Sequence, residues 1–324
     1  NLEPPTSNPQ PRTSNLEPPT SNLQLYNMNR RTFLTQTALS AGALTLLQKD
    51  ILTALFQEPW KISMLTSDIG VFTERGGTIL FYLSKKGIAV VDSQFPDQSK
   101  HLIDELKKKS EKPFKVLINT HHHGDHSGGN ISFKGLVEHV VAHEISKINQ
   151  EKTAKQNKNE DKQLYPDQTY TGTWCQKLGK EKICLHYFGA GHTNGDSFVH
   201  FQHANIVHCG DLVFNRRHPY VDRSAGANMK SWISVIDKAL QTFDAQTRFV
   251  YGHAGTGFDI TGNTDDLKAF RDYIGNVLKF VEGEMKSGKS KEEILKATII
   301  PGSEAWKTEG IQRPLLAAWE ELKG

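Results

Sequence analysis

The sequence of 324 residues has little cysteine and no marked excess of charge of either sign. Three cysteines are too few for a disulfide scaffold or a cysteine-rich zinc site, so the stability must come from a hydrophobic core. The 39 Lys and Arg against 36 Asp and Glu leave a net charge of +3, and no basic run is interleaved with aromatic residues, which argues against a nucleic-acid partner. No Pro-, Gly- or Ser-rich linker follows about residue 60. With 37% hydrophobic residues, residues 60–324 are predicted to form one domain that ends in helices.

The N-terminal part differs in composition from the rest. Residues 1–27 contain the octapeptide Asn-Leu-Glu-Pro-Pro-Thr-Ser-Asn twice, so we expect disorder upstream of a true start at Met28. Residues 28–57, with Arg30-Arg31 before a weakly apolar run, resemble a twin-arginine export signal. That run is too short to span a bilayer, so membrane contact is expected only through the signal. We predict a periplasmic or otherwise exported protein; an ordinary amphipathic helix is the alternative for this segment.

Alternating apolar runs and turn residues predict two similar β-rich halves with outer helices. Such halves pack as two sheets face to face between helical layers. The predicted strands are 69–72, 78–83, 88–92, 114–119, 183–188, 197–201, 206–208 and 248–251, and the predicted helices are 99–110, 229–243, 265–283 and 291–297. The polar segment 147–162 is predicted to be a solvated helix or a mobile insertion, with a lid over the site as the alternative.

The strongest chemical signal is His121-His122-His123-Gly124-Asp125-His126, directly after the strand that ends at Thr120. Strand alternation places His121 and His123 on one side, and a turn at Gly124 brings Asp125 and His126 back toward the same point. Neutral imidazole and carboxylate are ligands that suit Zn²⁺. His122 is expected on the opposite face, in a supporting role.

Three further ligand-type residues stand beside glycine near predicted strands. They are His192 after Gly191, Asp211 after Gly210 and His253 after Gly252. Glycine beside a ligand allows the tight turn and the close backbone approach that a metal pocket requires. The other histidines considered are interpreted as structural or exposed: His101, His139, His143, His186, His200 and His203.

With these motifs in this order, residues 60 to 280 resemble the metallo-β-lactamase fold superfamily. The resemblance implies an αββα sandwich of two mixed sheets between outer helices, and two zinc ions per chain. It implies a first zinc on His121, His123 and His192, a second on Asp125, His126 and His253, and Asp211 as the bridge. The lactamases with the best-known pattern have a cysteine where this chain has Asp211, so the likeness moves toward bridging-aspartate members, which include hydroxyacylglutathione hydrolases and lactonases. Di-iron members carry a glutamate where this chain has His123, which favours zinc.

The resemblance predicts a hydrolase in which a hydroxide between two zinc ions attacks a carbonyl, with Asp125 orienting it and relaying its proton. The expected substrate is a small β-lactam, lactone or related ester or amide, and not a phosphodiester, because no basic surface is evident. The alternatives are a thioesterase of hydroxyacylglutathione hydrolase type and a non-catalytic zinc-bound binding protein. Arg216, Arg217 and Tyr220 follow Asp211 on a loop and are the expected substrate contacts, with Phe214 or Trp232 as an apolar wall.

Two of the three cysteines fall on a predicted hairpin. Gly179-Lys180 suits a type II′ turn, and counting outward pairs Cys175 with Cys184 at a non-hydrogen-bonded position. The close Cα spacing of such a pair can accommodate a disulfide. Two reduced cysteines are the alternative, because a slip of one residue separates them. Cys209 is expected to remain a thiol, most simply as a small buried strand residue.

Overall fold

The computed structural model describes residues 59–324. The predicted disordered segment 1–27 and the predicted signal segment 28–57 lie outside the described residues. Within residues 59–324, no helix combines the length and the apolar character needed to cross a membrane.

The first sheet has seven strands in sequence order. The first four are antiparallel neighbours: β1 (Lys61–Met64), β2 (Ile69–Thr73), β3 (Ile79–Ser84) and β4 (Gly87–Val91). The next three continue in parallel: β5 (Phe114–Ile118), β6 (Val137–His143) and β7 (Gln168–Tyr170). Helix α2 (Pro96–Lys109) links β4 to β5, and α4 (Glu144–Asn157) links β6 to β7.

The second sheet has six strands in the order β15-β13-β11-β10-β9-β8. They are β8 (Thr173–Leu178), β9 (Glu181–His186), β10 (Phe198–Phe201), β11 (Ile206–His208), β13 (Arg248–Val250) and β15 (Thr261–Gly262). A separate pair joins β12 (Phe214–Asn215) to β14 (His253–Ala254). The helices of this half are α5 (Met229–Thr242), α6 (Thr264–Lys286), α7 (Lys291–Ile294) and α8 (Gln312–Lys323).

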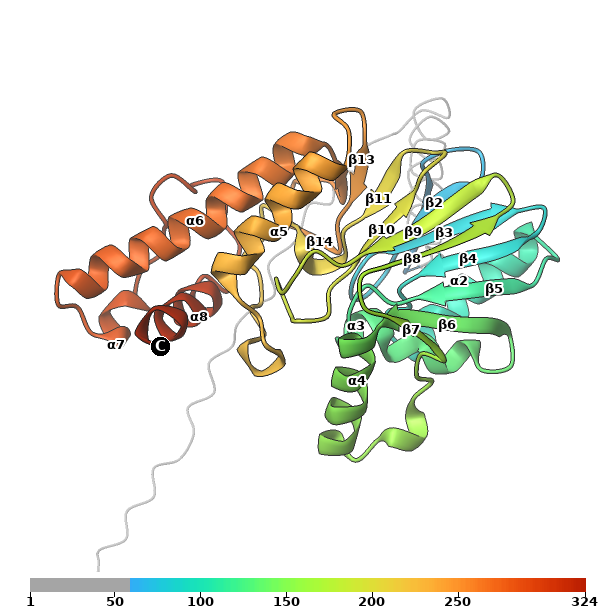
Figure 1. Cartoon of the computed structure of the whole chain (residues 1–324), viewed down its shortest axis with the longest axis horizontal. Coiled ribbons are helices and arrows are strands. Elements are labelled where there is room, and N and C mark those ends of the chain that lie inside the picture. The colour runs from blue at the N-terminus through green and yellow to red at the C-terminus, as the bar shows by residue number, and fades with distance from the viewer. Residues whose placement is uncertain (1–58) are drawn as a thin grey trace, which may run out of the picture. The chain divides into compact units, whose positions relative to one another are not determined.

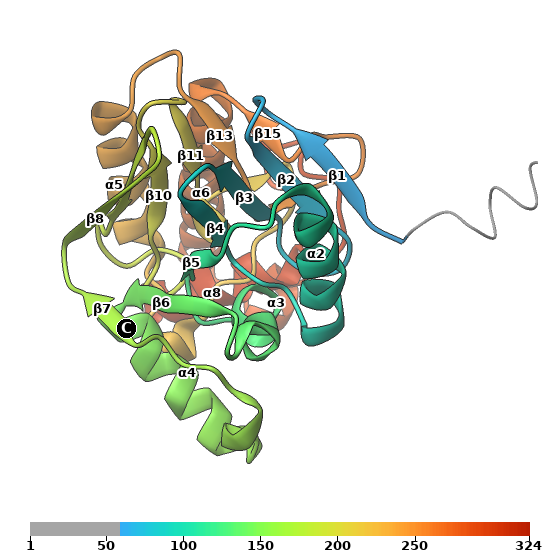
Figure 2. The same ribbon diagram turned by 90° about the vertical axis from the view of Figure 1, so that its right-hand side faces the viewer.

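Strand alternation divides the apolar side chains among three interfaces. On β3, Ile79 and Phe81 pack with Leu102 of α2, whereas Leu80 and Tyr82 face the second sheet. The outer face of the second sheet packs against α5, α6 and α8. Helices α2 and α5 thus lie on opposite sides of the strands (Figure 1 and Figure 2). The predicted αββα sandwich of two mixed sheets is confirmed.

Most predicted elements are present, with small shifts in their ends, and several were not predicted. Strands β1, β6, β7, β12, β14 and β15 and helix α8 were missed. The polar segment 147–162 is largely the helix α4, which buries Ser146, Asn149 and Gln150, followed by the short η2 (Glu160–Lys162). This matches the predicted helix rather than a mobile insertion.

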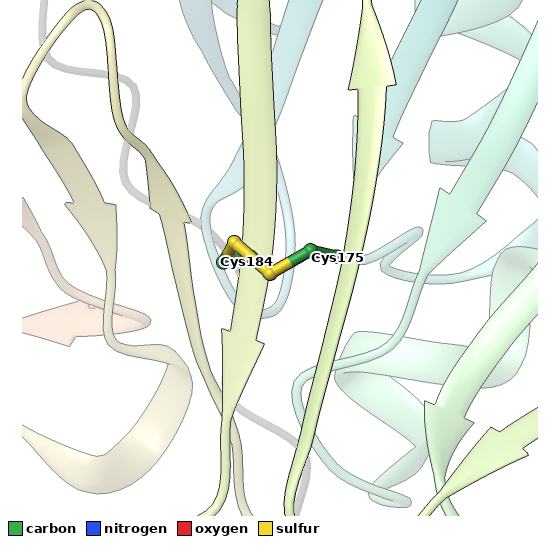
Figure 3. The surroundings of a disulfide bond; sticks show 2 residues. All are labelled: Cys175 and Cys184. Carbon is green, nitrogen blue, oxygen red and sulfur yellow. A yellow bond between two sulfur atoms is a disulfide. The ribbon is translucent and has the colours of Figure 1, made fainter.

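The hairpin of β8 and β9 has the predicted register, with Cys175 opposite Cys184. The two residues form a disulfide with a Cα–Cα distance of 4.2 Å (Figure 3). Gly179 takes a φ of 58° at the first central position of the turn, as a type II′ turn requires. Cys209 is a buried free thiol. Both cysteine predictions are confirmed.

Candidate metal centre

The seven predicted ligand side chains come together from both halves of the sandwich. His121 and His123 lie on the loop after β5, and Asp125 and His126 lie in α3 (Gly124–Ser127). The other three are His192 between β9 and β10, Asp211 in η3 (Gly210–Leu212) after β11, and His253 at the start of β14. The centre therefore lies where strand ends of the two sheets meet.

Three imidazoles form the first group. The Nδ1 atom of His123 lies 3.1 Å from Nε2 of His121 and 2.8 Å from Nε2 of His192. His121 and His192 are completely buried, whereas His123 is partly exposed. Three ring nitrogens thus point at one position, with a side open to solvent at His123.

A second group lies beside the first. Nε2 of His253 lies 3.1 Å from Oδ2 of Asp125 and 3.4 Å from Nε2 of His126. Asp211 stands between the two groups, since its Oδ2 is 3.5 Å from Nε2 of both His192 and His253. In each group the candidate ligand atoms lie within 4.8 Å of one another.

Two buried histidines are held by a network around Asp92, at the end of β4. Nδ1 of His126 donates to Oδ2 of Asp92 over 2.7 Å. The Thr120 hydroxyl also donates to Asp92 and accepts from Nδ1 of His121, 3.1 Å away. These partners assign the ring protons to Nδ1, so the Nε2 lone pairs of both histidines face the centre.

His123 and His192 are fixed in a comparable way. Nε2 of His123 donates to Oδ2 of the buried Asp222 over 2.9 Å, which leaves Nδ1 facing the centre. Nδ1 of His192 donates to the carbonyl oxygen of Tyr220 over 2.7 Å, which leaves Nε2 free. Each of the four histidines therefore directs toward the same small volume the ring nitrogen that a metal would bind.

At two positions beside the centre, the absence of a side chain on glycine leaves space for a ligand side chain. A Cβ atom on Gly77 would lie 2.1 Å from Cε1 of His126, and one on Gly252 would lie 2.1 Å from Oδ1 of Asp211. No side chain fits at either distance. Gly252, beside His253, is thus needed to leave space for the Asp211 carboxylate.

Burial and neighbouring charge separate the protonation states of the centre. Burial, with the nearby histidines, lowers the pKa of His121 well below its ordinary value and that of His192 to about 3. Burial opposes ionisation of Asp125, but His126 and the hydrogen bond from His253 outweigh it and lower the pKa to about 2. Burial also opposes ionisation of Asp211, but His253 and His126 lower its pKa well below the usual range. Burial opposes protonation of His126, but Asp211 and Asp92 outweigh it and raise its pKa well above the ordinary value. Neutral His121 and His192 and the ionised carboxylates are in the states that bind a metal cation, whereas His126 must release a proton when the cation binds.

This donor set fits a metal. Oδ1 of Asp211 is buried without a hydrogen bond from any described residue, although His126 lies close by. Leaving a buried carboxylate oxygen and several imidazole lone pairs facing one another is costly unless a cation lies between them. Imidazole with carboxylate oxygen is a donor set typical of zinc sites.

His122 points away from this centre. Its Nε2 lies 3.7 Å from Oδ2 of Asp222, and burial lowers its pKa to about 3. The ring borders a separate hollow of about 310 Å³ between α3 and α4, with Gln150 and Ala154 on the opposite wall. Helix α4 lines this hollow and contributes nothing, within the described residues, to the opening above the metal ligands, so it is no lid in this conformation.

A hollow of about 130 Å³ opens above the candidate ligands. Arg217, Tyr220 and Phe214, three of the residues expected near the substrate, line it, whereas Trp232 is buried and donates to the Leu212 carbonyl. Arg216 is placed elsewhere than predicted. Its φ of 54° turns the side chain away, so that the guanidinium pairs with Asp266 at 3.0 Å and stacks 5.1 Å from the Trp306 ring centroid.

A sequence profile of the metallo-beta-lactamase superfamily matches residues 72–254, which contain all seven candidate ligands. The chain belongs to this superfamily. Among curated relatives, metallo-beta-lactamase IND-1 of Chryseobacterium indologenes is 26% identical over 190 residues, which cover 57% of this chain and 75% of that protein. Metallo-beta-lactamase type 2 of Bacillus sp. (strain 170) is 28% identical over 207 residues, covering 60% and 77%.

Solved structures agree on the fold of this superfamily member. The metallo-beta-lactamase from Pontibacter korlensis aligns with a TM-score of 0.56 at 22% identity, covering 67% of this chain and 99% of that one. Metallo-beta-lactamase IND-7 aligns with a TM-score of 0.54 at 19% identity and the same coverage. Family membership and the ligand set together make the chain a metal-dependent hydrolase.

Three residues of the site could not be identified from the metallo-β-lactamase motifs alone. Asp92 and Asp222 hold metal-facing histidines, and Arg313 of α8 lines the hollow. Of these three residues, only Asp92 could have been found from the sequence. It follows a strand whose parallel neighbour in the first sheet ends at Ile118, so both strand ends lie at one edge.

Proposed function

We propose that the chain binds two zinc ions, one on His121, His123 and His192 and the other on Asp125, His126 and His253, with Asp211 as the bridge. The bridging role is supported by the equal 3.5 Å distances from Oδ2 of Asp211 to one histidine of each group. A carboxylate has two oxygens, so it can serve both groups at once. This makes the chain a bridging-aspartate member of its superfamily.

The proposed reaction is hydrolysis of a small carbonyl compound, such as a β-lactam, a lactone or a related ester or amide. The observation that carries it is the hollow of about 130 Å³, which gives a small molecule direct access to the candidate metal ligands. The named relatives, which are metallo-beta-lactamases, support the same class. When bound, zinc supplies a nucleophilic water at neutral pH and polarises the scissile carbonyl.

The protein's own residues would orient the water and take up its proton. The Asp125 side chain is 32% exposed and lines the hollow, and its low pKa keeps it ionised at neutral pH. An ionised carboxylate at this place can accept a hydrogen bond from a water and relay its proton. Tyr220 and Phe214 would form the wall against which the substrate rests.

The substrate class is tested by a panel offered to zinc-loaded protein: nitrocefin, a homoserine lactone, a hydroxyacylglutathione thioester and bis-p-nitrophenyl phosphate. We expect the highest kcat/KM on the β-lactam or the lactone. Preference for the thioester or the phosphodiester would reject the proposal, and no turnover at full zinc occupancy would favour a binding protein. Elemental analysis should give two zinc ions per chain.

Ligand variants test the roles of the metal residues. His121→Ala should abolish turnover, and Asp211→Ala should loosen the second ion before the first. His203→Ala is the matched control, because this histidine is exposed on the turn after β10. Equal effects of the His121 and His203 changes would contradict the assignment.

We also propose that the protein is exported to the periplasm and acts there on a small molecule rather than on nucleic acid. The disulfide supports this location, because such bonds persist mainly in oxidising compartments. The near-neutral charge supports the choice of substrate. Fractionation of cells carrying the full chain should find it in the periplasm, and Arg30→Lys with Arg31→Lys should retain it in the cytoplasm.

A further inference from the structure

The hollow of about 310 Å³ between α3 and α4, named here the α4 hollow, lies on the reverse of the segment that carries four candidate metal ligands. His122, Gly124 and Ser127 of that segment border it, and they share no place with the residues that line the opening above the metal ligands. Sites for small molecules commonly span about 300–1,000 Å³. The α4 hollow therefore has room for a molecule of about one ring.

Three polar side chains that line the α4 hollow each have an atom that no described residue satisfies. His122 is 6% exposed, and its Nδ1 is buried without a hydrogen-bond partner. Gln150, also 6% exposed, donates from Nε2 to Oδ1 of Asn119 over 3.3 Å, whereas its Oε1 accepts from no described residue. Oδ1 of Asn159 is likewise buried without a partner. Buried polar atoms of this kind are costly unless something hydrogen-bonds to them.

The walls of the α4 hollow are held in place by hydrogen bonds of their own. Asn119, the partner of Gln150, exchanges two side-chain hydrogen bonds with Asn130, over 3.0 and 2.8 Å. On the facing wall, the Ser127 hydroxyl donates to the carbonyl oxygen of His122 over 2.9 Å. A site with its walls already fixed loses little conformational freedom when a molecule binds.

The lining residues indicate which chemistry would be recognised. None of the described residues that line the α4 hollow is Asp or Glu, so it offers no counter-charge to a cation. Its one basic side chain, Lys162, is exposed to solvent, which is a weak basis for holding an anion. The other polar groups are mainly side-chain amides and hydroxyls, which both donate and accept hydrogen bonds. Phe95 and Ala154 add apolar surface.

We infer that the α4 hollow is a binding site for a small uncharged polyhydroxy compound, of the size and chemistry of a single pyranose sugar. Sugar hydroxyls also donate and accept, so they match the amides of Gln150 and Asn159, and the C–H faces of the ring match Phe95 and Ala154. This site is separate from the opening where the carbonyl substrate would react. It stands or falls independently of the proposed hydrolysis.

The test is calorimetric titration of N-acetylglucosamine into zinc-loaded full-length protein, with glucose as a second neutral probe. Gln150→Leu removes the amide at similar size and should raise the Kd about fivefold, the effect of losing one neutral hydrogen bond. Ala154→Leu places a larger side chain in the hollow and should abolish binding. Gln241→Leu, the same chemical change at an exposed position on α5, is the matched control and should leave the Kd unchanged.

A second measurement locates the site without depending on any variant. Hydrogen exchange of wild-type protein should slow in residues 122–128 and 150–163 when N-acetylglucosamine is added, and remain unchanged in residues 250–254 at the metal centre. The inference is overturned if neither sugar binds, if protection appears at residues 250–254 instead, or if Ala154→Leu binds as wild type does. Tighter binding of phenyl phosphate than of the sugars, lost in Lys162→Gln, would show an anion site and also overturn it. Zinc content and melting temperature verify that each variant is folded.

Discussion

The histidines of the centre are oriented by residues that surround it. These surrounding residues determine how well the histidines bind metal. His123 is the most exposed of the four with an assigned tautomer, and its donation to Asp222 fixes both the ring angle and the proton. A carboxylate partner also raises the basicity of the opposite ring nitrogen. Asp222 therefore belongs to the machinery of the site as a positioning residue.

We predict that Asp222→Asn lowers zinc affinity by about tenfold to a hundredfold, because a neutral acceptor polarises the His123 ring less. Competition with a chromogenic chelator measures this affinity directly. Asp272→Asn is the control, since Asp272 is an exposed partner of Arg271 on α6. An affinity equal to that of wild type would show that the Asp222 charge is irrelevant to the ligand.

A second prediction concerns the room behind His126. Gly77→Ala should lower both metal content and melting temperature, because the added methyl group overlaps the imidazole ring. Gly275→Ala is the contrasting change. A Cβ atom at position 275 on α6 would have no other atom within 4 Å, so this change should raise the free energy of unfolding by about 0.5–1 kcal/mol through helix propensity. Thermal unfolding and elemental analysis of the two variants test the pair, and normal zinc content in Gly77→Ala would contradict the argument.

The four candidate ligands within residues 121–126 could be proposed because they cluster after one predicted strand, and the other three because each follows a glycine and keeps the order of the family's motifs. Asp222 could not, since it meets His123 from 99 positions away. The choice between Arg216 and Arg217 also depends on structure. Adjacent arginines look alike in a sequence, and only the left-handed backbone of Arg216 directs it to Asp266.

At the scale of the elements, the strands that could be predicted are continuous apolar runs bounded by turn residues, such as β3 and β4. This pattern missed β6, whose first half exposes polar residues, and β1, a short edge strand with little burial. Helix α8 was missed because Pro314 and polar residues interrupt its apolar spacing, although Pro314 sits in the first turn, where it costs no hydrogen bond. These elements are set by tertiary packing.

The neighbouring strands β9 and β10 predict a pH dependence of stability. His200 packs against Phe243 beside His186, and burial, with the positive charge of His186, lowers its pKa from 6.5 to about 4. Between about pH 4 and pH 6.5, His200 binds a proton in the unfolded chain but not in the folded chain. Stability should therefore fall as pH decreases from about 6.5 to 4, with no further loss from this group below that.

Melting temperature against pH, compared between wild type and His200→Phe, isolates this contribution. The curve of the variant should be flatter between pH 6.5 and 4, because the variant cannot take up the proton. Parallel curves for the two proteins would show that His200 titrates normally in the folded state.

The disulfide closes a short loop, with a sequence separation of 9, so its contribution should be modest. Chain entropy gives at most about 3 kcal/mol for a loop of this length. We expect the double change Cys175→Ser and Cys184→Ser to lower the unfolding free energy by about 2 kcal/mol in a denaturant titration, with kcat/KM unchanged, because the hairpin contributes no ligand. Thiol titration of the denatured wild type should find one free thiol, and three would reject the bridge.

At the scale of the whole molecule, the metal centre draws ligands from loops of both sheets. His121, His123, Asp125 and His126 come from the first half, and His192, Asp211 and His253 from the second. Bound metal should therefore stabilise the sandwich as one cooperative unit. We predict that chelation lowers the melting temperature and increases hydrogen exchange in residues 119–127 and 250–254 above that in α6. Uniform exchange with and without metal would contradict this.

The disulfide has a further consequence, because β8 is the outermost strand of the second sheet. An edge strand can pair with another chain, and a strand whose register can slip is prone to such alternate pairing and to aggregation. The covalent link between Cys175 and Cys184 prevents any slip of β8 along β9, and Lys177 adds an exposed charge to the same edge. The bond thus opposes self-association along this border of the sheet, a benefit that a measurement of folding free energy alone would not register.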